Sequence, residues 1–288
     1  MADTVILAAC QPPWASDHRS PAQVRDAALE LAELAADRGA TVLVLPEYAN
    51  VPGMRRAEAL ACCDETAEEM TARLAELARR RGVWVLLPLL LRRDGKLRNT
   101  AVFLSPDGPI GYYDKVHLAR AEREQWGIVA GYDYPVFETP WGRVGIMICY
   151  DVCFPEAARI LAVRGADVIF FPSLQRSYTE RHLELQVRSR AYDNFVWVVR
   201  SSYGTPREEG WAPGQPVGKS CIAAPDGTLV ADAGRWVGIA LAEAPLDQPE
   251  KGPVSYSGPI EPLRQARMAD RRPETYGPLA EEAPRADD

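Results

Sequence analysis

Short apolar runs alternate with amphipathic stretches along most of this chain of 288 residues. An apolar run bounded by turn residues is typical of a buried strand, whereas apolar residues three and four positions apart are typical of a helix that faces a core. The apolar runs predict strands at Thr4–Cys10, Thr41–Leu45, Trp84–Leu91, Thr100–Leu104, Val136–Thr139, Val144–Ile148, Val168–Phe171, Phe195–Arg200, Ser220–Ala224, Leu229–Val230 and Ile239–Ala242.

Helices are predicted between several of these strands. A capping box begins at Ser20, with proline at the first helical position, and the apolar spacing that follows ends at Gly39. Further helices are predicted up to Gly82, over Pro155–Arg164 and over Glu180–Asp193. Strands interleaved with helices predict one α/β domain with layered sheets, which we place at residues 1–246.

After Pro245 the composition changes to proline, glycine and charged residues, with few apolar residues at any period. Such a segment cannot bury a core of its own. We interpret residues 247–288 as a C-terminal tail that contacts another subunit, and we expect its end at Glu281–Asp288 to be disordered.

The composition limits the partners and the compartment. The net charge is −7 and no cluster of Lys or Arg offers a phosphate-binding stripe, so nucleic acid is not an expected partner. No apolar stretch is long enough to cross a membrane, and the N-terminus lacks the basic region of a signal peptide. The six scattered cysteines then predict reduced thiols and a cytoplasmic protein. The three histidines are not at metal-ligand spacing, so no metal is expected.

Cys149 follows the predicted strand Val144–Ile148 and precedes Pro155, which suits the first residue of a helix. A thiol at such a junction lies at the edge of a sheet, near backbone N–H groups and a helix dipole that lower a thiol's pKa. Free cysteine is also among the most buried residue types. The junction alone leaves two interpretations, a nucleophile or a structural core cysteine.

Two charged residues stand where they could meet this thiol. Glu47 follows the apolar run that ends at Pro46, and Lys115 lies within Tyr112–Leu118. Ligands of open α/β sheets bind beyond the carboxyl ends of the strands. A carboxylate can take a thiol's proton, a lysine can stabilise an oxyanion, and a thiolate can attack an electron-poor carbon. Taken singly, each residue also fits a solvated surface charge.

The chain resembles the nitrilase superfamily of carbon–nitrogen hydrolases. Three motifs stand in the family's order: Leu45–Tyr48, Tyr113–Leu118 and Gly145–Asp151, the last running on to Glu156. The resemblance spans roughly Val5 to Leu246. It implies a four-layer α-β-β-α sandwich, a homodimer or higher oligomer, and chemistry without a cofactor.

The resemblance also implies roles for individual residues. Cys149 matches the nucleophile, Glu47 the general base, and Lys115 the cation that stabilises the tetrahedral intermediate. The family has a second glutamate between the lysine and the cysteine. Glu124 fits that position best, and Glu122 is the rival.

The resemblance further implies an oxyanion hole made by the backbone N–H of Tyr150 with the Lys115 ammonium. Tyr48, Tyr150 and Ser173 match positions that line the substrate pocket. Each has an ordinary alternative, core packing for the tyrosines and a turn or cap for the serine.

The residues after the nucleophile narrow the substrate. Tyr150 and Asp151 resemble the amidase branches, whereas nitrilases usually have Trp-Glu there. Branches that act on carboxylate-bearing substrates place arginine just after this step, where the chain has Val152. The expected reaction is therefore hydrolysis of a small aliphatic or amino-acid primary amide to a carboxylic acid and ammonia, through a thioester on Cys149.

An N-carbamoyl amine or amino acid is the alternative substrate, because Arg176 or Arg200 could supply a cation from another loop. We nevertheless expect both arginines to be solvated at the surface. A nitrilase, a catalytically silent relative and a Cys–His hydrolase that uses His117 are weaker alternatives.

Overall fold

The computed structural model describes residues 4–16, 18–176, 179–253 and 258–281. The chain divides into two compact units, Met1–Gln248 and Pro249–Asp288. All the predicted site residues belong to the first unit.

The first unit contains two mixed sheets of six strands each. The first sheet has the order β12 (Gly238–Ala244), β1 (Val5–Gln11), β2 (Val42–Val44), β3 (Trp84–Arg93), β4 (Lys96–Ser105) and β5 (Gly108–Asp114). Strands β1, β2 and β3 are parallel, and the outer strands pair antiparallel.

The second sheet repeats this plan, with a parallel centre and antiparallel outer pairs. Its order is β11 (Leu229–Asp232), β10 (Cys221–Ala223), β9 (Trp197–Ser201), β8 (Val168–Pro172), β7 (Gly142–Ile146) and β6 (Val136–Thr139).

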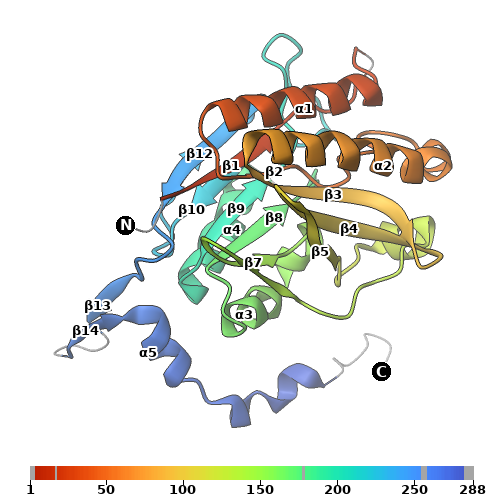
Figure 1. Ribbon diagram of the computed structural model, residues 1–288. Helices are drawn as coiled ribbons and strands as arrows, with labels where there is room; N and C mark the ends of the chain where they lie inside the picture. The colour runs from red at the N-terminus through yellow and green to blue at the C-terminus, as the bar shows by residue number, and fades with distance from the viewer. Residues whose placement is uncertain (1–3, 17, 177–178, 254–257, 282–288) are drawn as a thin grey trace. The chain divides into compact units, whose positions relative to one another are not determined.

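Helices cover the outer face of each sheet. Helices α1 (Pro21–Asp37) and α2 (Arg56–Arg81) pack on the first sheet, and α3 (Pro155–Val163) and α4 (Glu180–Asn194) pack on the second (Figure 1). The predicted capping box at Ser20 starts α1. The two sheets face each other across an aromatic layer in which Phe103 contacts Phe137 and Phe170. The predicted four-layer α-β-β-α sandwich is confirmed.

The parallel strands bring their carboxyl ends together. Glu47 follows β2, Cys149 follows β7 and Leu174 follows β8. Lys115 comes directly after β5, a strand that the sequence pattern did not predict, because its glycines and proline interrupt the apolar run. The four segments that follow β2, β5, β7 and β8 lie far apart in the sequence and meet at one place in the structure.

The second unit is small. Strands β13 (Lys251–Pro253) and β14 (Ile260–Pro262) form a short antiparallel pair, and α5 (Leu263–Ala269) buries no residue. The segment interpreted as a C-terminal tail contains some regular structure. The predicted disorder at its end concerns mainly residues 282–288, which lie outside the described residues. No helix in the described ranges is long and apolar enough to cross a membrane.

Candidate active site

A cavity of about 240 Å³ lies where these four segments meet. Glu47, Lys115 and Cys149 all line it, as the motifs predicted. The rest of the wall consists of Trp14, Tyr48, Val51, Gly53, Met54, Ala119, Ala121, Glu122, Trp126, Leu174 and Arg176.

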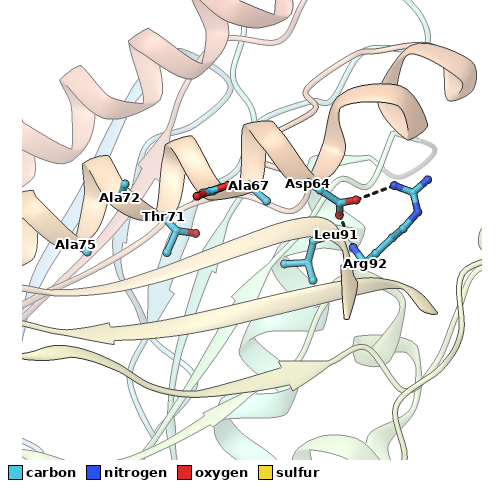
Figure 2. A pocket seen from close by; sticks show the side chains of 8 residues that line it. Asp64, Ala67, Thr71, Ala72, Ala75, Leu91 and Arg92 are labelled. Atoms are coloured by element: carbon cyan, nitrogen blue, oxygen red, sulfur yellow. Dashed lines mark hydrogen bonds and ion pairs between the residues drawn. The ribbon is translucent and has the colours of Figure 1, made fainter. Parts of the chain in front are cut away.

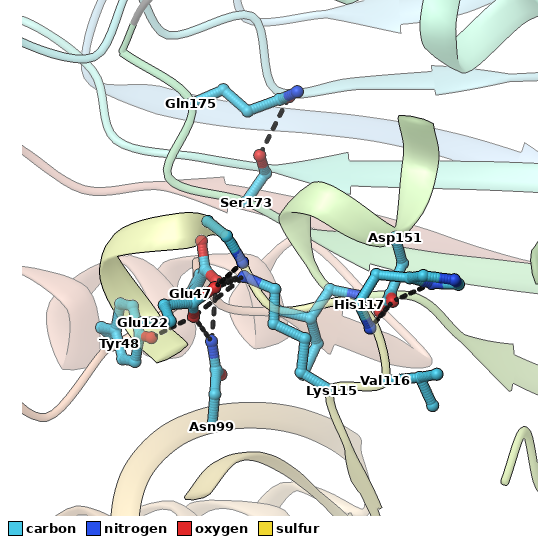
Figure 3. A network of polar contacts seen from close by, with 12 residues as sticks. Glu47, Tyr48, Asn99, Lys115, Val116, His117, Glu122, Asp151, Ser173 and Gln175 are labelled. Carbon is cyan, nitrogen blue, oxygen red and sulfur yellow. Dashed lines mark hydrogen bonds and ion pairs between the residues drawn. The ribbon is translucent and has the colours of Figure 1, made fainter. Parts of the chain in front are cut away.

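The Lys115 ammonium lies between two carboxylates (Figure 3). Its Nζ is 2.8 Å from Glu47 Oε1 and 2.8 Å from Glu122 Oε2. Lys115 and Glu47 are each only 2% exposed, and Glu122 is 7% exposed. Charges buried this deeply are stable only when they are paired, and the one cation here serves two anions.

Neutral donors complete the pairing. Asn99 Nδ2 donates to Glu47 Oε1 (2.8 Å) and to Glu122 Oε1 (3.0 Å), which joins the two carboxylates. The Tyr48 hydroxyl also donates to Glu122, and the Ala119 backbone N–H donates to Glu122 Oε2 at 2.7 Å. Glu122 is thereby held by four donors and has little freedom to move.

The backbone around Lys115 is held from both sides. Its N–H donates to Asn99 O and its carbonyl accepts from Gly131 N–H, each at 2.9 Å. A Cβ at position 131 would lie 2.2 Å from Asp114 O, so only glycine allows this approach. This close contact between Gly131 and the Asp114 carbonyl fixes the backbone position of Lys115 at the cavity.

The surroundings move the pKa values of the two carboxyls apart. Burial raises the pKa of Glu47, and the nearby Glu122 charge adds to this against the lowering effect of Lys115. Burial also acts on Glu122, but the Lys115 charge and the hydrogen bonds from Lys115, Tyr48 and Asn99 outweigh it, so its pKa is lowered. Lys115 itself keeps a pKa well above its usual value: burial lowers it, but Glu47, Cys149 and Glu122 more than compensate. Pairs of carboxyls separated in this way identify which one is the proton acceptor, and here it is Glu47.

Cys149 begins a single 3₁₀ turn, Cys149–Cys153, with α3 starting two residues later at Pro155. Its φ is 48° and that of Tyr48 is 59°, both in the left-handed region that side chains seldom adopt. Strained backbone of this kind is concentrated at functional sites. A 3₁₀ turn leaves its first N–H groups without an acceptor inside the turn, and the N–H of Tyr150 is one of them.

The thiol of Cys149 is a weak acid in this structure. Burial raises its pKa, the Glu47 charge raises it further, and Lys115 and the backbone N–H of Leu174 offset only part of the effect. The lowered pKa expected from the strand–helix junction is therefore wrong. The thiol and the Glu47 carboxylate line the same cavity and each shifts the pKa of the other, so the thiol proton has an acceptor nearby.

A second polar cluster lies beside the first. Buried Asp151 accepts hydrogen bonds from Tyr113 Oη (2.6 Å), His117 N (2.8 Å) and Ile148 N (2.9 Å), and His117 Nδ1 lies 3.0 Å from it. Tyr134 Oη is 2.9 Å from the same imidazole nitrogen. Figure 3 shows His117 turned toward Asp151, in a position that gives no support to a Cys–His pair.

The choice of Glu124 as the second glutamate is corrected. Its carboxylate pairs with Arg120 at 2.8 Å and is 52% exposed. Residues Glu122–Trp126 form one turn of π-helix, in which Glu122 is the buried member. The rival residue therefore occupies the place beside Lys115.

Two of the three expected pocket residues lie elsewhere. Ser173 is fully buried and its hydroxyl donates to Gln175 Oε1 at 3.1 Å, while its neighbour Leu174 lines the cavity. Tyr150 packs edge-on against Phe154, with ring centroids 5.3 Å apart, and is not part of the described lining. Tyr48 does form part of the wall.

The two arginines differ from each other. Arg200 was expected at the surface but is fully buried, and its Nη1 donates to the carbonyls of Gly218 (2.7 Å) and Lys219 (2.8 Å). Arg176 is exposed at the cavity, over the ring of Trp14. Neither Asn99 nor Leu174 was picked out from the sequence. The signal for Asn99 was a polar pair, Asn99-Thr100, directly before the apolar run of β4.

A larger hollow, of about 450 Å³, lies along α2 and the end of β3 (Figure 2). Its polar groups are the ion pair between Arg92 and Asp64 at 2.7 Å, with Glu68 and Thr71, and the remaining lining is three alanines and Leu91. Its lining contains neither a cysteine nor a lysine. The chemistry therefore belongs to the smaller cavity, although the other is larger.

Comparison with known proteins agrees with this geometry. The model of the carbon–nitrogen hydrolase family matches residues 6–251, and the chain belongs to that family. An omega-amidase of Xenopus tropicalis is 32% identical over 231 residues, which cover 76% of this chain and 82% of the relative. A deaminated glutathione amidase of Synechocystis sp. is 33% identical over 236 residues, covering 76% and 85%.

Solved structures share the fold. An amidase from Nesterenkonia sp. superposes with a TM-score of 0.77 at 21% identity, covering 97% of both chains. A variant of that enzyme, with acrylamide added to its active-site cysteine, has a TM-score of 0.73 at 23% identity, covering 85% of this chain and 96% of the other. Together the family match and the curated relatives make the protein an amidase-type carbon–nitrogen hydrolase.

Proposed function

We propose that this protein hydrolyses a small primary amide, releasing ammonia and a carboxylic acid through a thioester on Cys149. The supporting observation is the arrangement around Lys115. One buried ammonium separates a carboxyl with a raised pKa, Glu47, from one with a lowered pKa, Glu122, and the Cys149 thiol lines the same cavity.

In the first half of the reaction, the sulfur attacks the carbonyl carbon while Glu47 takes the thiol proton. A thiol whose pKa is raised by its surroundings needs such a base, because it does not ionise on its own. The carbonyl oxygen becomes an oxyanion, for which the Lys115 ammonium and the Tyr150 N–H are the proposed donors. The C–N bond then breaks, the protonated Glu47 gives its proton to the nitrogen, and ammonia leaves.

In the second half, water replaces ammonia. Glu47 takes a proton from this water as the water oxygen attacks the thioester carbon. The C–S bond breaks, the carboxylic acid forms, and the proton on Glu47 returns to the sulfur. Glu122 keeps its charge throughout and holds Lys115 protonated and in place.

The test is ammonia release by the purified protein on a panel of short aliphatic amides, amino-acid amides, ω-amides of dicarboxylic acids, N-carbamoyl amino acids and nitriles. We expect turnover of primary amides that is absent in Cys149→Ala. Cys153→Ala is the matched control, since that cysteine lies four residues away in the same 3₁₀ turn.

Other outcomes would contradict the proposal. Equimolar carbon dioxide and ammonia from N-carbamoyl substrates alone would replace it with the N-carbamoyl alternative. Ammonia release that survives Cys149→Ala would exclude the thioester on this residue.

A further inference from the structure

One residue of β4 contacts the charged groups of the site through both its side chain and its backbone. Asn99 is only 1% exposed. Its amide nitrogen donates to Glu47 Oε1 at 2.8 Å and to Glu122 Oε1 at 3.0 Å. Its backbone carbonyl accepts from the N–H of Lys115 at 2.9 Å. Asn99 takes no part in the proton transfers proposed above, yet it is placed to act on the geometry of all three residues.

The Asn99 amide and the Lys115 ammonium bond to the same pair of oxygens (Figure 3). Lys115 Nζ is 2.8 Å from Glu47 Oε1 and 3.0 Å from Glu122 Oε1, the atoms that Asn99 Nδ2 also reaches. Two nitrogens and two oxygens therefore form a closed ring of hydrogen bonds. Rotation of the Glu47 carboxylate would break both of the bonds to its Oε1.

The two carboxylates differ in their second oxygen. Glu122 Oε2 accepts from Lys115 at 2.8 Å and from the Ala119 N–H at 2.7 Å, so both oxygens of Glu122 are engaged. The donors of the ring bond to Glu47 Oε1 and do not bond to its Oε2. A carboxylate oxygen receives a proton through an open lone pair. Because Glu47 lines the cavity together with Cys149, Oε2 is the oxygen suited to exchange protons there.

The orientation of the Asn99 amide leaves one of its own atoms unsatisfied. Its Oδ1 is buried and has no hydrogen-bond partner in the part of the chain that the structure describes. Turning the amide over would point this oxygen at Glu47 Oε1 and Glu122 Oε1, and acceptors would then face acceptors. The observed orientation is therefore the favourable one. A buried acceptor without a donor lowers stability, so its presence calls for an explanation, and the two bonds to the carboxylates supply one.

We propose that Asn99 is a positioning residue for the proton transfers: with Lys115 it holds Oε1 of Glu47 and leaves Oε2 to carry the proton. The inference rests on the proposed function and deepens it. In the first half of the reaction the proton passes from sulfur to Oε2 and from Oε2 to the leaving nitrogen. In the second half it passes from water to Oε2 and from Oε2 back to sulfur. Oε1 keeps both of its donors throughout.

The position has a consequence for the pH dependence. A hydrogen bond donated to a carboxylate favours its charged form, so loss of the Asn99 amide should raise the pKa of Glu47. Activity needs ionised Glu47, and the acid limb of kcat/KM should then move to higher pH. The titratable groups that face Glu47 stay in place when Asn99 is replaced: Lys115, Glu122, Cys149, Tyr48 and Tyr203, with Arg176 also in the cavity lining.

Asn99→Leu tests the proposal, because leucine has a similar shape and no donor. We expect kcat to fall by about 10- to 100-fold with a smaller change in KM, since the base is no longer held in orientation. The acid limb should move to higher pH. Asn99→Asp keeps the shape of the amide still more closely and turns its donors into an acceptor, so kcat should fall at least as far.

Asn194→Leu is the matched control. Asn194 is 2% exposed, its Nδ2 donates to the Arg190 carbonyl at 2.9 Å, and its Oδ1 is likewise without a partner among the described residues. It lies at the end of α4 and is not part of the cavity lining. This variant should lose stability and keep the pH profile of the unaltered protein. An acid limb that stays in place in Asn99→Leu, or that moves equally in Asn194→Leu, would overturn the inference.

A titration without turnover separates the inference from the proposed function. Carbon-13 NMR of labelled glutamate carboxyls follows Glu47 in Cys149→Ala, with its signal assigned by the signal that is lost when Glu47→Gln is added. The signal should titrate at higher pH once Asn99→Leu is introduced into the same variant. Such a shift supports the inference even if the intact protein releases no ammonia. An unchanged titration would contradict it.

Discussion

A buried lysine between two carboxylates determines which carboxylate can act as a base. The Lys115 ammonium and three further donors hold Glu122 in its charged form. Of these donors, only Lys115 and Asn99 also bond to Glu47. Burial disfavours the charged form of Glu47, so its pKa is raised. A basic carboxylate beside a neutral thiol is the combination that a proton transfer from sulfur requires.

The pH dependence of the reaction follows from these directions. Activity needs ionised Glu47, so kcat/KM falls as the pH falls through its pKa, which lies above the usual 4.5. We expect an acid limb at a pH higher than that of an exposed glutamate. Glu122→Gln removes a charge that raises the Glu47 pKa, so the limb should move to lower pH while kcat decreases. Because the groups are coupled, the profile reports the cluster.

Glu124→Gln is the control for this measurement. Glu124 lies two residues beyond Glu122, and its exposed side chain pairs with Arg120. The pH profile of this variant should match that of the unaltered protein. If the acid limb of the pH profile moves in Glu124→Gln but not in Glu122→Gln, then Glu124, and not Glu122, is the carboxylate that acts on Glu47.

The residue scale is also where the sequence was least informative. Glu122 and Glu124 are equivalent in spacing, and the π-helical turn that buries the first leaves no pattern in the sequence. Successive side chains of an extended segment point to opposite sides. The residue after β8 that lines the cavity is therefore Leu174, one position beyond the predicted Ser173. By contrast, Glu47 and Cys149 could be predicted because each lies three residues beyond a buried parallel strand and within a motif of the family.

At the scale of elements, two segments that carry the chemistry are tied together by one carboxylate. Asp151 lies two residues after Cys149, and His117 lies two residues after Lys115. The Asp151 carboxylate accepts a hydrogen bond from the backbone N–H of His117 and faces its ring. Tyr113, at the end of β5, donates to the same carboxylate. Asp151 is thus a positioning residue between the Lys115 segment and the Cys149 turn.

Asp151→Asn tests this tie. The amide keeps one acceptor oxygen and points an NH₂ group at the remaining donors, so it should cost about 1–3 kcal/mol of unfolding free energy. We also expect kcat to fall by about 10- to 100-fold, with a smaller change in KM, when assayed well below the unfolding midpoint. Asp133→Asn, at an exposed ion pair with Arg164, should change neither quantity.

A structural role alone would show a different result. If Asp151 only stabilised the fold, the variant would lose stability but keep its kcat at low temperature. Full activity together with normal stability would contradict the role altogether.

Most elements were predicted from the apolar pattern, because the inner strands of both sheets are buried on both faces and read as continuous apolar runs. The strand β5 and the π-helical turn were missed. Their sequences follow neither the period of a helix nor that of a strand, and they owe their shape to pairing with β4 and to the buried pairing of Glu122.

At the scale of the whole molecule, the outer helices of the second sheet expose apolar side chains. Val163 on α3 is 47% exposed and Leu185 on α4 is 63% exposed, and these two helices pack side by side. The family resemblance implies a homo-oligomer, and a second copy of the chain would cover such a face. We expect a dimer or larger assembly by sedimentation velocity.

A double variant, Val163→Glu with Leu185→Glu, should shift the protein toward the monomer because charges in a covered apolar face are unfavourable. Val230→Glu is the control, at an equally exposed valine on β11 (45%). An assembly unaffected by the double variant, or disrupted equally by the control, would place the interface elsewhere.

The central claim is that Cys149 carries the acyl group, and intact-protein mass spectrometry of rapidly quenched reactions tests it most directly. With a primary amide substrate, the mass should rise by that of the acyl group, and peptide mapping should place the addition on Cys149. The addition should be absent in Cys149→Ala and present in Cys153→Ala. An acyl group on any other residue, or ammonia release by Cys149→Ala, would contradict the account.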